Sequence, residues 1–274
     1  MSGVRAGGGG ESAMYVDYQD TQLRVVSDHP LSSSDARSLA ARIERAWAHD
    51  TKVQRWDDQR PLQKQLTVAV LSAQAFARFT GDDTGSVAGV TTGKDLLVVP
   101  NRVLHGTTPD DEDTIAHELS HVQDFREAGD AMDSVPTYLE EGKASVIGDA
   151  WGRDPRHLAD TARTMASLTA EDAAYLLKNF RSASAERRPP QFVYAGEVTG
   201  ALFVEFLATH VNRDAVVHLS DAVEAAGKGT RFTTAFAKAF GLSLTEAEQR
   251  FVAFIRDTEG EPSRRLAGTL YEPR

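Results

Sequence analysis

The sequence has no cysteine among its 274 residues. This absence excludes disulfide bonds, iron–sulfur clusters and zinc sites made of thiolates. No apolar run approaches the roughly twenty residues that a membrane-spanning helix needs, so we expect no membrane span. The chain is nevertheless long enough to bury a substantial hydrophobic core in one large or two small domains.

Acidic residues outnumber basic residues, 40 to 30. The formal net charge is −10, and the one basic pair that stands out, Arg187-Arg188, falls in a predicted loop. Because nucleic acids are bound through clustered basic residues, a nucleic-acid partner is not expected. With 41% apolar and 26% charged residues, the chain has the composition of a soluble globular protein.

The amino-terminal residues lack an apolar segment. Residues 1–13 include a run of four glycines and are expected to form a disordered tether. They do not have the pattern of a secretory leader. The compartment is left open: a cell-envelope or secreted location requires that a leader has been removed, and otherwise the cytoplasm is expected. No oligomeric state is indicated either.

Histidine and glutamate are present in an informative spacing. The segment Thr114–Phe125 includes His117, Glu118 and His121 in the pattern His-Glu-x-x-His. On a helix, residues four apart lie on one face, so the two imidazoles can bind one metal ion. Zinc bound in this way needs a third protein ligand and an open position for water. Glu118 projects beside the pair, where it can accept a proton from that water.

The neighbouring residues favour a metal site over the alternative, which is two surface histidines on an ordinary helix. Thr108 and Pro109 form a helix start, with acidic residues in the first turn. Gly129 is a suitable left-handed stop. An apolar stripe at helical spacing lies between them and consists of Ile115, Leu119 and Val122. The pattern predicts an amphipathic helix of about five turns that carries the motif.

The third ligand is expected from the next acidic cluster, Glu140-Glu141. These two positions lie about 100° apart around a helix, so periodicity alone does not choose between them. One of them need not be a ligand at all, because Glu140 can pair with Lys143 on the solvent-exposed face of the same helix.

Together the two segments resemble the gluzincin metallopeptidases, a group that includes thermolysin, aminopeptidase N-type enzymes and the peptidase MA-like family. In that group His-Glu-x-x-His is followed some twenty residues later by Leu-x-Glu-Gly-x-Ala, found here from Leu139 to Ala144. The resemblance implies that Glu141 is the third ligand, on a second antiparallel helix, and that one Zn²⁺ is bound per chain. Two details depart from the pattern, since Tyr138 replaces a tryptophan and Ser145-Val146 replace bulky or acidic residues.

The resemblance also implies hydrolysis of peptide bonds, with Glu118 as the general base. Such an enzyme needs a donor that stabilises the oxyanion. Tyr194 is the first candidate for that role, followed by His210 and Tyr138. Side chains that orient the ligating histidines are expected among a further set. That set consists of Asp113, Asp124, Ser145 and Asp149.

The predicted function is therefore a zinc metallo-endopeptidase that acts on a peptide or protein substrate. An aminopeptidase would need an acidic anchor for the substrate amine, and the Gly-x-Met-Glu-Asn-type segment of the large aminopeptidases is absent. The alternative from another class is a catalytically silent zinc-binding scaffold that holds a partner in its cleft. The presence of Glu118 argues against the scaffold.

The order of strand and helix patterns predicts an α+β fold: a small mixed sheet with flanking helices and the motif helix, followed by a mainly helical C-terminal subdomain. By the resemblance, the strand at 96–99 is the sheet edge beside the cleft, and an ordinary interior strand is the alternative. The acidic turn at 82–85 is expected to be solvated and not a calcium site. The elements predicted before the motif are a strand or hairpin within 14–27, a helix from Ser32 to about His49, strands at 66–71 and 96–100, and a short helix at 73–79.

From residue 154 onward the pattern is helical. The predicted helices are 155–168, 170–180, 194–211, 213–226, 231–240 and 244–257, with a loop at 182–191. The expected division is a disordered tail at 1–13, an α+β lobe with the zinc-binding helices at 14–153, a helical subdomain at 154–262 and a C-terminal tail at 263–274.

Overall fold

The computed structural model describes residues 14–55, 65–81, 88–105, 109–152, 168–180 and 190–258. Within these residues the fold is mixed α+β, as the sequence predicted. Several predicted features lie outside them: both tails, the acidic turn at 82–85, most of the loop at 182–191, and the helix at 155–168 except for its last residue.

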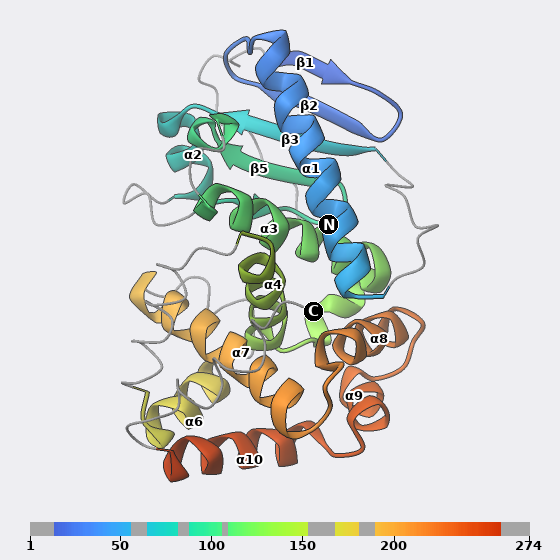
Figure 1. The fold of residues 1–274 in the computed structure, drawn as a ribbon, viewed down its shortest axis with the longest axis vertical. Helices are drawn as coiled ribbons and strands as arrows, with labels where there is room; N and C mark the ends of the chain where they lie inside the picture. The colour runs from blue at the N-terminus through green and yellow to red at the C-terminus, as the bar shows by residue number, and fades with distance from the viewer. Residues whose placement is uncertain are drawn as a thin grey trace.

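The described strands form one five-stranded mixed sheet in the order β1-β2-β3-β5-β4 (Figure 1). The first two strands are an antiparallel hairpin, which confirms the prediction for 14–27. The pairs β2–β3 and β3–β5 are parallel, and β4 runs antiparallel to β5. The strand bounds are β1 Tyr15–Gln19, β2 Leu23–Ser27, β3 Leu66–Leu71, β4 Val90–Thr91 and β5 Leu96–Pro100.

The assignment of the 96–99 strand to the sheet edge is wrong. A turn at Gly93, where φ is +66°, folds β4 back onto β5. The backbone amide of Thr92 donates to the carbonyl of Leu96 at 2.9 Å. Because β4 has only two residues, it gives almost no periodic signal in the sequence, yet it is the strand that occupies this edge among the described residues.

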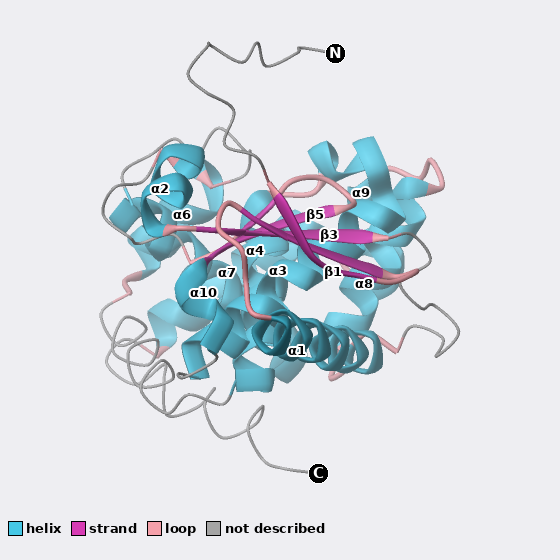
Figure 2. Ribbon diagram, turned by 90° about the horizontal axis from the view of Figure 1, so that it is seen from above, coloured by secondary structure: helices cyan, strands magenta, loops and turns pink. Residues whose placement is uncertain are grey.

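Successive side chains of the central strands pack on opposite faces of the sheet. One face is covered by helices α1, Ser33–Val53, and α3, Pro109–Ala128, and the other by α2, Ala73–Thr80. Figure 2 shows the strands from above with α1 on one side of them. The side chain of Ser32 caps α1 by accepting from the amide of Asp35, as predicted, but α1 continues four residues past His49. Asp50 and Thr51 in its last turn are buried, and Thr51 accepts from Gln123 of α3, a contact that local periodicity does not report.

A second hydrophobic core lies among the helices that follow α3. In this part α10 has the predicted bounds and α7 begins at Pro190, four residues earlier than predicted. Proline suits the first position of a helix because its missing N–H has no partner there. The helix bounds are α4 Thr137–Gly152, α6 Ala170–Asn179, α7 Pro190–His210, α8 Ala215–Gly227, α9 Phe232–Phe240 and α10 Leu244–Asp257, with 3₁₀ turns at Asn101–His105 and Gly129–Ser134.

Helix α4 packs between α3 and α7 (Figure 1). It approaches α7 through two glycines, because a Cβ added to Gly142 would lie 2.2 Å from the carbonyl carbon of Gly200. A Cβ on Gly200 would lie 2.0 Å from the carbonyl oxygen of Tyr138. Any larger side chain at either position would force the helices apart. The glycine next to Glu141 therefore sets how closely α7 approaches that residue.

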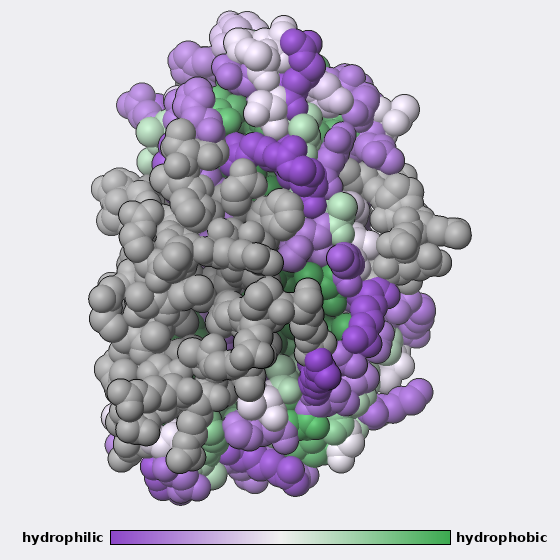
Figure 3. Space-filling model, viewed as in Figure 1, coloured by the Kyte–Doolittle hydropathy of each residue, from purple (hydrophilic) through white to green (hydrophobic). Residues whose placement is uncertain are grey.

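The described surface is mostly hydrophilic on the face drawn in Figure 3, and hydrophobic colour is confined to small patches there. Over the described residues only five large hydrophobic side chains are exposed, and three of them, Met14, Tyr15 and Val16, lie at the start of β1. No helix in the described ranges has the length and apolar content needed to cross a bilayer.

Candidate metal centre

The motif lies on α3, and its spacing produces the expected geometry. Residues 117 and 121 are one helical turn apart, so their imidazoles project from one face. Their Nε2 atoms are 3.1 Å apart, and the ring centroids are 4.9 Å apart in an edge-to-face arrangement. Ile115, Leu119 and Val122 on the other side of α3 are fully buried against the sheet. Burial of this stripe fixes the direction in which His117 and His121 point.

Glu141 on α4 completes the cluster. Its Oε2 lies 3.2 Å from Nε2 of His117 and 3.4 Å from Nε2 of His121. The three atoms thus form a triangle whose sides are close to the ~3.3–3.4 Å ligand–ligand separation of tetrahedral zinc with bonds of about 2.0–2.1 Å. Two imidazole nitrogens and one carboxylate oxygen are also the donor types that zinc accepts. The residues present therefore fit a divalent ion of this kind.

Glu140 faces His121 and not Lys143, which was the partner expected for it. Its Oε1 lies 3.3 Å from Nδ1 of His121, as an ion pair that is less well aligned than a full hydrogen bond. The expected pairing of Glu140 with Lys143 on an exposed face is wrong, because Lys143 is buried. A carboxylate facing Nδ1 favours the tautomer with its proton there and leaves Nε2 free to bind a metal ion.

The lysine is part of a buried polar network behind the cluster. Its Nζ donates to Asp124, to Oε1 of Gln54 at 3.0 Å and to Oγ of Ser220 at 3.4 Å. Asp124 had been a candidate partner of the histidines, and it pairs with Lys143 instead. The network joins α1, α3, α4 and α8. Asp149 was another candidate partner of the histidines, and its side chain lies outside the part of the chain that the structure describes.

The charges in the cluster are strongly coupled. Burial alone would lower the pKa of His121, but the Glu141 and Glu140 carboxylates outweigh burial and hold that pKa well above the usual value. For His117, burial is likewise outweighed, chiefly by the hydrogen bond with Glu141, and the pKa is raised. Burial would raise the pKa of Glu141, but the histidines, His121 first, hold it far below the usual value. Glu141 is therefore ionised at neutral pH, as a metal ligand must be.

Glu118 is held from the side by the edge strand. Its side chain is only 8% exposed. Oγ1 of Thr91 on β4 lies 2.8 Å from Oε2 of Glu118 and 2.8 Å from its backbone oxygen, so the hydroxyl proton serves one of them at a time. A Cβ on Gly89 would lie 2.9 Å from Cγ of Glu118. The residues around β4 therefore restrict the orientation of the Glu118 carboxylate, and its charge acts on His117.

The structure places Tyr138 and His210, two of the three oxyanion candidates, away from this cluster. Tyr138 is fully buried in the second core, where its hydroxyl donates to Oε1 of Glu248 at 2.5 Å. His210 is at the far end of α7, where its ring contacts Phe206 and Phe254. The prediction for Tyr194 stays untested, because its side chain lies outside the described part of the chain.

One residue near the cluster was missed in the sequence. Glu197 lies on α7, one turn after Tyr194, and burial followed by the charge of Glu141 raises its pKa to about 7. The charges of His117, Glu118 and His121 also act on it. The only available signal was an acidic residue in a densely apolar helix, and such a residue has no partner pattern of its own.

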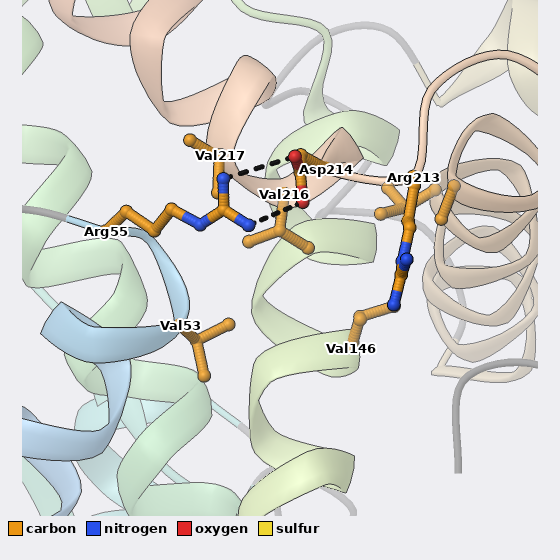
Figure 4. Close-up of a pocket in the computed structure, with 9 residues that line it drawn as sticks. Val53, Arg55, Val146, Arg213, Asp214, Val216 and Val217 are labelled. Atoms are coloured by element: carbon orange, nitrogen blue, oxygen red, sulfur yellow. Dashed lines mark hydrogen bonds and ion pairs between the residues drawn. The ribbon is translucent and has the colours of Figure 1, made fainter. Parts of the chain in front are cut away.

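A separate pocket lies between the end of α1, α4, α7 and the start of α8 (Figure 4). Arg55 lies on one side of it and pairs with both carboxylate oxygens of Asp214, at 2.8 and 3.1 Å. Much of its lining is valine, at positions Val53, Val146, Val204, Val216 and Val217. The histidines and acids of the candidate centre do not line this pocket, so it is not part of the same site.

The sequence matches no family model, and a search of the curated proteins finds no relative. A functional assignment for this chain therefore depends on the chemistry of its own residues. The strongest grounds are the three converging ligand atoms of His117, His121 and Glu141, with Glu118 beside them.

Proposed function

We propose that this protein is a zinc-dependent peptide-bond hydrolase, with one Zn²⁺ held by His117, His121 and Glu141. The observation that carries the proposal is the triangle of two imidazole nitrogens and one carboxylate oxygen, with sides of 3.1, 3.2 and 3.4 Å. A general base beside that triangle supports hydrolysis over simple metal storage. The resemblance to gluzincin metallopeptidases rests on the same residues.

In this proposal Glu118 is the catalytic residue. When bound, zinc lowers the pKa of a water molecule and polarises a carbonyl oxygen. Glu118 accepts the proton of the attacking water and passes it to the leaving amine. Thr91 and the close approach of Gly89 hold the Glu118 carboxylate in place, which reduces the conformations it must lose in the transition state.

The proposal also assigns roles to individual helices and strands of the fold. Helix α3 acts as the active-site helix, and α4 contributes the acidic ligand. The helices within residues 154–262 act as a helical subdomain that closes the site from the side of α7. The short strand β4, beside Glu118, is suited to hold an extended peptide by strand addition, the role that the sequence had given to β5.

A catalytically silent zinc-binding scaffold is the second candidate. The observation in its favour is that Tyr138 and His210, two of the three expected oxyanion donors, lie away from the cluster. Loss of such a donor typically reduces kcat by about 10²- to 10³-fold. The third candidate, Tyr194, is the one on which an active enzyme would rely.

The test combines metal analysis with peptide cleavage. The wild type is expected to bind one zinc per chain and to cut members of a broad peptide library. Glu118→Gln should bind the same amount of zinc while kcat falls by about 10²- to 10⁴-fold, because a general base contributes a factor of that size. Glu246→Gln is the control, since it removes the same charge at an exposed position on α10.

Each outcome favours one candidate. A wild type that binds zinc and cuts nothing in the library supports the scaffold. Full activity in Glu118→Gln contradicts the role of Glu118 as the base. Failure of the wild type to bind zinc above the level of a His117→Ala, His121→Ala double variant contradicts both candidates.

A further inference from the structure

The proposed reaction leaves one acidic group of the site without a role. Glu197 on α7 is neither in the ligand triangle nor beside Thr91, yet burial and the charges of Glu141, His117, Glu118 and His121 all act on it. It lies one turn before Gly200, whose backbone touches Gly142 next to Glu141. Residues three apart share a face of a helix, so Glu197 lies on the side of α7 that faces α4.

Glu197 is also accessible, and no bond to a described residue satisfies it. It is partly exposed, and within the described ranges it forms no hydrogen bond and no ion pair. By contrast, Glu140 faces His121, and Glu118 accepts from Thr91. A half-buried carboxylate without a partner is costly, and a cation from outside the chain would remove that cost.

A metal ion in the triangle would favour the ionised form of carboxylates close to it. An ionised Glu197 is an acceptor only and does not serve as a proton donor to an oxyanion. Its place on the α4-facing side of α7, one turn before the contact of Gly200 with Gly142, puts that acceptor on the side of the helix where Glu141 lies.

We propose that Glu197 binds an ammonium group of the substrate next to the scissile bond. The inference rests on the proposed hydrolase and narrows its substrates to peptides with a primary amine at that place. The amine has two sources, a free N-terminus or a lysine side chain. The first makes the enzyme an aminopeptidase, whose acidic anchor the sequence search had not found, and the second makes it an endopeptidase that cuts beside lysine.

The first test measures binding without catalysis. Hydroxamates bind zinc through two oxygens, so leucine hydroxamate and its N-acetyl form differ at the amine alone. A second pair, 6-aminohexanoic hydroxamate and hexanoic hydroxamate, places the amine at the end of a lysine-like chain. In one of the two pairs, calorimetry on the zinc-loaded protein should show that the amine-bearing hydroxamate binds about ten- to a hundredfold more tightly than its neutral counterpart. This is the difference expected for a charged hydrogen bond.

The variant Glu197→Gln keeps the size of the side chain and removes its charge. We expect it to bind zinc as the wild type does, to melt at no lower temperature, and to lose the difference between the amine and its neutral counterpart. Glu246→Gln, an exposed change of the same charge, should keep the difference. Equal affinity for both members of both pairs in the wild type, or an unchanged difference in Glu197→Gln, overturns the inference.

The second test uses cleavage and identifies the source of the amine. Peptides with free and acetylated N-termini, and with lysine or norleucine beside the cut bond, are compared by KM and kcat. Glu197→Gln should raise KM for the amine-bearing member more than it lowers kcat, and leave the neutral member unaffected. Cleavage with no dependence on an amine contradicts the inference and leaves the hydrolase intact. An amine preference in hydroxamate binding without any cleavage leaves the ammonium site intact and contradicts the hydrolase.

Discussion

At the scale of single residues, the two adjacent glutamates of α4 face different atoms of the candidate centre. Oε2 of Glu141 lies in the ligand triangle, whereas Glu140 faces the opposite nitrogen of His121. In the proposed centre, Glu141 would bind the metal directly and Glu140 would orient one of its histidine ligands. Their side chains diverge by about 100° around α4, and the ring of His121 extends between them.

Substitution of each glutamate should therefore weaken zinc binding to different degrees. Glu141→Gln removes a charged ligand and should reduce zinc affinity by more than about a hundredfold. Glu140→Gln removes only a partner of a ligand, for which losses of about 10- to 100-fold are typical. Competition with a chromophoric chelator measures both affinities. Equal losses would contradict this division of roles. A larger loss for Glu140→Gln would indicate that Glu140 and not Glu141 is the ligand.

The pH dependence of the metal-free protein follows from the same residues. The pKa values of His117 and His121 are raised in the folded state, so the stability that they contribute is complete below pH 6.5 and is lost as pH rises through the raised values. Glu197, with a pKa of about 7, acts in the same direction between pH 4.5 and 7. The melting temperature of chelator-treated protein should fall between pH 6.5 and 8.5.

Zinc should reverse this trend, because only neutral imidazoles bind the ion. The loaded protein is expected to become more stable relative to the metal-free form as pH rises over the same interval. The variant His117→Asn, His121→Asn should show a flatter profile without metal. A metal-free wild type whose melting temperature rises from pH 6.5 to 8.5 would contradict the assignment of the raised values.

At the scale of secondary structure elements, the buried network of Lys143 and Asp124 joins four helices. Both side chains are almost fully buried, and Gln54 of α1 and Ser220 of α8 bind the same ammonium group. Asp50 of α1 lies in the same region, and burial, opposed by the charge of Lys143, raises its pKa well above the usual value. Helices of both cores therefore meet at one polar cluster.

Removal of one partner of this pair should be strongly destabilising. Asp124→Asn leaves a buried ammonium group without its counter-charge, which costs about 3–5 kcal/mol. The double variant Asp124→Leu, Lys143→Met should recover much of that loss, since an apolar pair of similar size leaves no charge unpaired. Urea unfolding of Asp124→Leu, of Lys143→Met and of the double variant measures the coupling.

The exposed pair Lys228–Glu224 is the matched control, with its atoms at 2.6 Å and its residues four apart in sequence at the end of α8. Such a surface pair contributes about 0.5 kcal/mol or less, so Lys228→Met should change stability little. A double variant at 124 and 143 that is no more stable than Asp124→Asn would show that the network is needed for more than charge compensation.

At the scale of the whole molecule, the candidate centre lies between two hydrophobic cores. The stripe of Ile115 and Leu119 on α3 packs against the sheet, whereas Tyr138 and Leu139 on α4 belong to the helical core. The histidines and Glu141 meet across this boundary. A metal ion held there cross-links the two halves of the chain.

Zinc should therefore stabilise the whole protein. Binding to the folded state alone contributes about 2.7 kcal/mol at a free concentration of 100 Kd. For a chain of this size that corresponds to a rise of about 5–10 °C in melting temperature, measured by calorimetry. The variant His121→Ala should melt at the same temperature with and without zinc. A wild type that responds as little as this variant would contradict a metal bridge between α3 and α4.

The sequence by itself determined the features that depend on near neighbours in the chain. The four-residue spacing placed His117 and His121 on one face of α3, and the apolar stripe of that helix fixed which face is buried. The start of α1 at Ser32 was recognised for the same reason, because its side chain bonds to an amide three residues away. The hairpin β1–β2 and the bounds of α10 also follow from local patterns.

Only the tertiary structure decided which side chains meet across different elements. It separated Glu140 from Glu141, buried Lys143 against Asp124, placed Tyr138 in a core and brought Glu197 towards the metal ligands. These outcomes depend on the rotation of each helix and on how closely it approaches its neighbour, which the Gly142–Gly200 contact sets for α4 and α7. Periodicity gives the face of a helix that is apolar, but a polar residue on that helix finds its partner only when the neighbouring helices are in place.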